Sequence, residues 1–139
     1  MRHTSKREHG QAMVEFALAF TIFIVIVMAV LDLAKGVYMY DSVSHAAREI
    51  ARTASVHPGA TLGTSPEVAS TVSAQQAIIP NLGTPAFTCV DISGASVSGT
   101  CGPGSWVRVT IAAPYRSVTP LIGLVGTFQI QSASSIQIP

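Results

Sequence analysis

The sequence predicts an α+β membrane protein in which a long N-terminal helix leads into a small antiparallel sheet domain. Hydrophobic residues make up 48% of the 139 residues and charged residues only 11%, well below the roughly one quarter that is typical of soluble domains. A run without any charge extends from Phe16 to Leu31. Near the C-terminus, apolar residues recur at every second position, which is the period of a strand with one buried face.

The stretch from Gln11 to Leu31 is long enough to cross a bilayer once. Its 21 residues contain a single charge, Glu15, and a helix rising 1.5 Å per residue would cover the roughly 30 Å of the hydrocarbon core. Three basic residues precede Gln11, and the next basic residue after it is Lys35. The positive-inside rule therefore predicts a cytoplasmic N-terminus and an extracytoplasmic chain beyond Leu31.

The helix is expected to continue past the membrane, because residues 11–57 contain no proline. Pro58 disfavours helical geometry at His57, so the helix should end there and residues 58–66 should form a linker to a domain at 67–139. An apolar stripe with helical spacing predicts that the second half of the helix is amphipathic. The stripe consists of Val43, Ala47, Ile50, Ala51 and Ala54.

The C-terminal domain is predicted to start with a short helix and then to form strands. Ser65 is placed to cap this helix, with Pro66 at its first position and Pro80 as its stop. Strands with a buried face are expected around Val107, Val109 and Ile111 and around Phe128 and Ile130, with further strands at 87–92 and 135–138, joined by connections rich in glycine or proline.

The only cysteines are Cys89 and Cys101, and both fall on the side predicted to be extracytoplasmic. Oxidising compartments favour disulfides, so we expect the two to be joined. Two free thiols within a small sheet are the alternative.

Several classes of function are disfavoured. The net charge is +1 without a long basic block, so we expect no nucleic-acid partner. The sequence has no phosphate-binding glycine loop, no CxxC and no pairing of nucleophile and base, so we expect no catalytic residues, no cofactor and no small-molecule substrate. His45 lies four residues from both Asp41 and Glu49, which favours a surface ion pair over a metal site.

The front edge of the membrane segment, from Gly10 through Gln11 to Glu15 and Phe16, resembles the signal of prepilins. In that family a prepilin peptidase cuts after the glycine, and glutamate is the fifth residue of the mature chain. The resemblance implies that residues 1–10 are a cleaved leader and that Gln11 is the new N-terminus. Glycine offers no side chain to obstruct a protease and permits an extended backbone there.

The same resemblance implies an assembly role for Glu15 and Phe16. A carboxylate at the rim of an apolar span is costly and calls for a cationic partner. In assembled pilins, that partner is the N-terminal amine of a neighbouring subunit. The alternative is that Glu15 reaches the headgroups at the end of an ordinary signal anchor.

The segment GQAMVEFALAF resembles the start of TadE-like and TadG-like proteins of tight-adherence (Flp) pilus systems. A small-residue stretch with Arg48 and Arg52 matches the family, and VRVTIAAPYRSVTPLIGLVG and FQIQSASSIQIP resemble its C-terminal end. The chain has Thr21-Ile22 where the family often has proline. Arg48 and Arg52 are assigned contacts with a partner, and a solvated helix face is the alternative.

The resemblance implies a minor pseudopilin in the bacterial inner membrane that takes part in pilus assembly. Its expected partners are the prepilin peptidase, other pilin-like subunits, the inner-membrane assembly platform and the lipid bilayer. Three alternatives stay open: a secreted protein cut near Val27-Met28-Ala29, a signal-anchored binding module, and a major structural pilin. Glu15 weakens the first, because a carboxylate disfavours a signal-peptide core.

Overall fold

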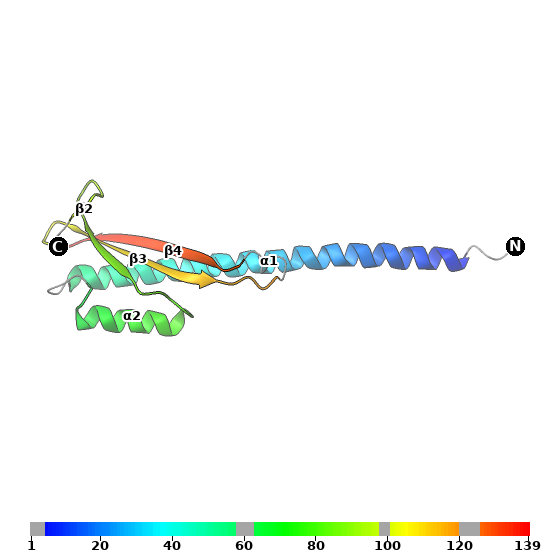
Figure 1. Ribbon diagram of the computed structural model, residues 1–139, viewed down its shortest axis with the longest axis horizontal. Coiled ribbons are helices and arrows are strands. Elements are labelled where there is room, and N and C mark those ends of the chain that lie inside the picture. The colour runs from blue at the N-terminus through cyan, green and yellow to red at the C-terminus, as the bar shows by residue number, and fades with distance from the viewer. Residues whose placement is uncertain (1–4, 58–62, 98–100, 120–125) are drawn as a thin grey trace.

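The computed structural model describes residues 5–57, 63–97, 101–119 and 126–139 and confirms the α+β class. The helix α1 (Ser5–Val56) is followed by α2 (Pro66–Ile78) and by a four-stranded antiparallel sheet. The sheet and α2 both lie along the C-terminal half of α1, and the N-terminal half extends away from them alone (Figure 1). One helix is therefore free of other elements along its N-terminal half, here called the bare half, and packs against the domain along its C-terminal half.

The bare half of α1 has the surface of a lipid-facing helix. Within the described residues, the helix from Gly10 to Val56 is the one candidate long and apolar enough to cross a membrane, and its most apolar window has no buried residue. The hydroxyl of Thr21 donates to the carbonyl of Ala17 at 2.8 Å, so its polar group is satisfied inside the helix. This architecture is compatible with a single-pass membrane anchor.

The other half of α1 packs on the sheet through the apolar stripe predicted from the sequence. All five residues of that stripe are fully buried in the core. Three of them are alanines, whose small side chains let the helix lie close to the sheet. The facing strand supplies Val107, Val109, Ile111 and Ala113 at alternate positions, also fully or almost fully buried.

The sheet has the order β2-β1-β3-β4 with every neighbouring pair antiparallel. Its strands are β1 (Ala86–Val90), β2 (Ser96–Val97), β3 (Trp106–Tyr115) and β4 (Phe128–Gln137). The prediction of a separate strand at 135–138 is wrong, because β4 runs unbroken over ten residues. No glycine or proline interrupts it, and its whole length pairs with β3.

Two other details of the strands differ from the sequence analysis. Phe128 was expected on the buried face but is 45% exposed, because it begins β4 opposite Tyr115, at the end of the sheet away from the core. Prolines were expected in the connections between strands, but Pro114 lies within β3. Pairing of β1 with β3 stops at Thr110, so Pro114 has a strand on one side only, and the missing N–H is tolerated there.

The short helix α2 has the ends predicted for it. Ser65 is the N-cap, its side chain accepts a hydrogen bond from the backbone N–H of Val68, and proline opens the helix. The helix ends at Ile78, just before the predicted stop. Val68 is its one buried residue. The helix α2 therefore contributes little to the core, which lies mainly between α1 and the sheet.

A disulfide joins Cys89 in β1 to Cys101 in the segment before β3, with the two Cα atoms 5.6 Å apart. Cross-linking residues separated by 12 positions constrains the unfolded chain by about 3 kcal/mol in the entropic model. The bond closes the part of the chain that contains β2, a strand of only two residues.

Candidate functional site

The motif that resembles a prepilin signal lies on the bare half of α1. Gly10, Gln11, Glu15 and Phe16 are all exposed, and the ring of Phe16 stacks on that of Phe20 with centroids 5.8 Å apart. A Cβ atom built on Gly10 meets nothing within 4 Å. The motif is therefore accessible along its whole length to another protein or to lipid.

The helix passes straight through the expected cleavage position. The sequence predicts an extended backbone at Gly10 with the helix starting after it, but α1 begins at Ser5 and includes Gly10. A peptidase that acts on an extended backbone would first have to unwind this turn. Glycine makes that easier, because it destabilises a helix by about 1 kcal/mol relative to alanine.

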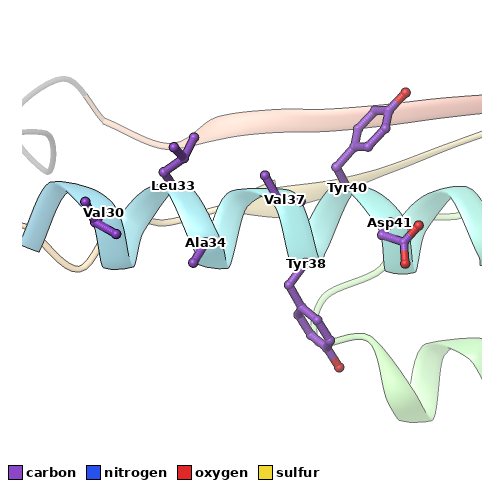
Figure 2. A pocket seen from close by; sticks show the side chains of 7 residues that line it. All are labelled: Val30, Leu33, Ala34, Val37, Tyr38, Tyr40 and Asp41. Carbon is purple, nitrogen blue, oxygen red and sulfur yellow. The ribbon is translucent and has the colours of Figure 1, made fainter.

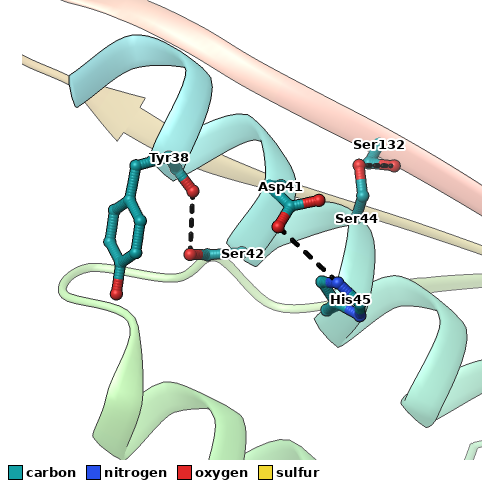
Figure 3. A network of polar contacts seen from close by, with 6 residues as sticks. All are labelled: Tyr38, Asp41, Ser42, Ser44, His45 and Ser132. Carbon is teal, nitrogen blue, oxygen red and sulfur yellow. Dashed lines mark hydrogen bonds and ion pairs between the residues drawn. The ribbon is translucent and has the colours of Figure 1, made fainter. Parts of the chain in front are cut away.

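The two arginines of the family-like stretch lie on the surface of the domain end of α1. Arg48 and Arg52 are exposed, and neither forms an ion pair with any acidic residue in the described parts of the chain. The ion pair that is present joins the imidazole of His45 to the carboxylate of Asp41 at 3.6 Å (Figure 3). Both arginines are therefore available to a partner. The same exposure is expected if they simply form a solvated helix face.

A polar cluster that the sequence analysis missed lies where the bare half of α1 meets the domain. Asp32 is only 6% exposed. One carboxylate oxygen accepts the backbone N–H of Val118 at 2.7 Å, and the other accepts the backbone N–H of Thr119 at 3.0 Å and also its hydroxyl. Both carboxylate oxygens are thus occupied by the segment that follows β3.

Two further contacts fix the same segment. The hydroxyl of Tyr115 donates to the backbone carbonyl of Asp32 at 2.8 Å, and the ammonium of Lys35 donates to the carbonyl of Arg116 at 2.9 Å. The same ammonium lies 5.5 Å from the centre of the Tyr115 ring, within range of a cation–π contact. Desolvation, together with the negative charge of Asp32, raises the pKa of Tyr115, which keeps the phenol a donor.

We refer to Asp32, Lys35, Tyr115, Val118 and Thr119 as the Asp32 clamp. It ties the end of β3 to the first turn of α1 after the segment 11–31, more than 80 residues away in sequence. The sequence contained one signal for it, because Asp32 is a lone carboxylate directly after an uncharged run. A charge in that place needs a partner, but nothing in the sequence identified which one.

Replacing Asp32 by asparagine should loosen the domain from α1. The amide retains the shape but offers a donor where the carboxylate accepted, so at least one of the three donors from Val118 and Thr119 loses its partner. We expect faster proteolysis within residues 116–127 and a lower unfolding temperature for the detergent-solubilised protein. Asp41→Asn is the matched control and should change little, because Asp41 is exposed and forms only a surface pair.

A double-mutant cycle separates the clamp from a general effect on α1. Thr119→Val removes the hydroxyl that Asp32 accepts, so the destabilisation by Asp32→Asn and Thr119→Val together should be smaller than the sum of the two alone. Strict additivity would contradict a direct interaction between these side chains.

Two shallow apolar grooves flank this part of α1. Figure 2 shows one of them, in which side chains project from successive turns of the helix. Its lining consists of Val30, Leu33, Ala34, Val37, Tyr38, Tyr40 and Asp41. The other groove is bordered by Leu33, Tyr115 and Ile130 among others. Within the described part of the chain, no group of three or more His, Cys, Asp or Glu residues could hold a metal ion.

The whole arrangement is that of a protein with one long apolar N-terminal helix, compatible with a membrane anchor, that continues as the spine of a small α+β domain. Residues 10–52 match the family model described as TadE-like protein. Over this segment the chain is similar to TadE-like proteins, in agreement with the resemblance noted in the sequence. No curated protein and no solved structure matches the chain.

Proposed function

We propose that this chain is a minor pseudopilin, a pilin-like subunit that takes part in assembling a tight-adherence pilus without catalysing a reaction. The observation that supports this most is the family match over residues 10–52. It begins at Gly10, includes Glu15, and ends at Arg52, so it covers each position of α1 to which the resemblance gives a role. Those positions are exposed and not used by the fold.

The proposed placement is a single crossing of the bacterial inner membrane by residues 11–31. Before processing, the basic residues ahead of Gln11 would hold the N-terminus in the cytoplasm, and the sheet domain would lie on the extracytoplasmic side. The disulfide between Cys89 and Cys101 supports that side, because disulfides persist in oxidising compartments.

The proposed partners follow from the same segment. A prepilin peptidase would cut the bond between Gly10 and Gln11, and the carboxylate of Glu15 would then receive the new N-terminal amine of a neighbouring pilin-like subunit. Phe16 and the apolar residues after it would pack on the helices of such subunits. Arg48 and Arg52 would contact a subunit or the assembly platform outside the membrane.

A minor role is favoured over that of the major pilin by the size of the domain. The described residues after α1 form a second helix and four strands around one core, whereas major pilins of this system are mostly short helical peptides. The major pilin, a secreted protein and a signal-anchored binding module remain the competing interpretations.

The proposal is tested in a cell that makes the pilus, by deleting the chain and restoring it with an affinity tag at the C-terminus. We expect piliation to be lost on deletion and regained on restoration, and tagged protein from solubilised membranes to recover pilin-like subunits in far less than the amount of the major pilin. Normal piliation without the chain, with no pilin-like subunit recovered, would contradict it. Recovery in the amount of the main filament subunit would favour a major pilin.

A further inference from the structure

The end of the globular domain that faces the bare half of α1 begins directly after the proposed membrane segment. No stretch of free helix separates the domain from that segment. The clamp joins Asp32, the first residue after the segment 11–31, to Val118 and Thr119. If Leu31 lies at the edge of the hydrocarbon, a helix rising 1.5 Å per residue puts Asp32 about 1.5 Å and Gly36 about 7.5 Å beyond it. The headgroup layer on each side is roughly 5 to 7 Å thick.

The surface at that level is apolar and cationic. We call Leu33, Lys35, Arg116, Val118 and Phe128 the domain base. Leu33 is 69% exposed, Val118 57% and Phe128 45%, and Lys35 and Arg116 are also exposed. Apolar side chains beside lysine or arginine are typical of surfaces at a membrane interface, where the stems lie among lipids and the charges reach the headgroups.

The one acidic group at this level is covered. Asp32 would repel anionic headgroups if it were free, but both of its oxygens are occupied by donors from the domain itself. The next acidic residue along α1 is Asp41, about 13 Å further from the membrane segment. The described surface nearest the bilayer therefore presents two cations and no uncovered carboxylate.

We propose that the domain base is seated in the headgroup layer of the outer leaflet, so that the sheet domain is docked on the bilayer rather than held away from it. The occupant is phospholipid, because Leu33 follows the exposed apolar residues Val30 and Leu31 on a helix that runs unbroken from its bare half into the domain (Figure 1). A second protein chain at the same place would have to displace lipid that already surrounds residue 31. This inference rests on the membrane crossing given under Proposed function.

Tryptophan reporters in reconstituted vesicles test this docking. The chain has one tryptophan, so Trp106→Phe gives a silent background into which single tryptophans are placed at exposed apolar positions. Phe128→Trp reports on the base, and Val56→Trp is the matched control at the far end of α1. Phe23→Trp, in the middle of the proposed span, reports whether the helix has inserted. Each is exposed to aqueous iodide and to phospholipids brominated near the headgroup or near the chain end.

We expect Phe128→Trp to be quenched by the shallow brominated lipid and to be several-fold less sensitive to iodide than Val56→Trp. Equal sensitivity of these two variants to iodide, without lipid quenching, would show that the base stands clear of the bilayer and would overturn the proposal. Protection of Phe128→Trp from both quenchers would also overturn it, in favour of a second copy covering the base. Failure of deeply brominated lipid to quench Phe23→Trp would instead contradict the membrane crossing itself, and the docking with it.

Discussion

Replacing Glu15 by valine should yield a processed, membrane-resident protein that no longer recovers pilin-like partners and does not support piliation. Insertion does not suffer, because removing a carboxylate from a lipid-facing helix improves partition by up to about 3 kcal/mol if the group lies deep. Cleavage should also survive, since Gly10 and Gln11 are unchanged. The expected phenotype thus separates a defect in assembly from defects in membrane insertion and in leader cleavage.

The loss follows from the cost of an unpaired charge. Glu15 is exposed on the bare half of α1, so it has no role in the fold that the substitution could disturb. Without it, the amine of a neighbouring subunit would remain unpaired in apolar surroundings, which costs several kcal/mol even after relaxation. That is enough to abolish recovery of a partner held mainly by helix packing.

Glu67→Val is the matched control, because it makes the same substitution at an exposed position of α2. It should leave partner recovery and piliation unchanged. Normal piliation and partner recovery with Glu15→Val would show that the carboxylate is only an interfacial anchor, and the assembly role would be wrong for this chain.

Replacing Gly10 by isoleucine should leave the leader attached. Nothing lies within 4 Å of a Cβ atom at this position, so the side chain fits the free helix and the domain is untouched. The effect would arise at the peptidase, where a β-branched side chain next to the cut bond obstructs binding. Intact mass should show a chain longer by residues 1–10, still in the membrane and inactive in assembly.

Gly10→Ala provides a graded control for this position. Alanine adds one methyl group and stabilises the helix by about 1 kcal/mol relative to glycine, so cleavage should slow but not stop. Normal cleavage of Gly10→Ile would contradict recognition of this glycine by the peptidase. Cleavage at a bond other than Gly10–Gln11 in both Gly10→Ile and Gly10→Ala would also contradict that recognition.

The elements governed by local patterns were predictable from the sequence. The stripe of Val43, Ala47 and Ile50 has helical spacing that only a buried helix face explains, and Val107, Val109 and Ile111 alternate as a half-buried strand does; all six are buried. Ser65 and Pro66 mark the start of α2 by chemistry that depends on a few neighbouring residues. Such signals do not require knowledge of the tertiary structure.

The features that the sequence analysis missed depend on contacts between distant segments. Asp32 and Thr119 meet only because β3 returns along α1, and no periodicity encodes that meeting. Phe128 has the alternation of a buried strand residue, but it lies at the end of the sheet beyond the core. The helix continues upstream through Gly10 because a single glycine lowers helix stability without ending a helix.

The mass of the mature chain taken from membranes of its own cell tests the central claim most directly. A prepilin-like protein should start at Gln11, with net charge changed from +1 to −1, because the leader contains three of the eight basic and one of the seven acidic residues. A chain that starts near Val30 would contradict the account in favour of a conventional signal peptide, and a chain that still begins at Met1 would show a plain signal anchor.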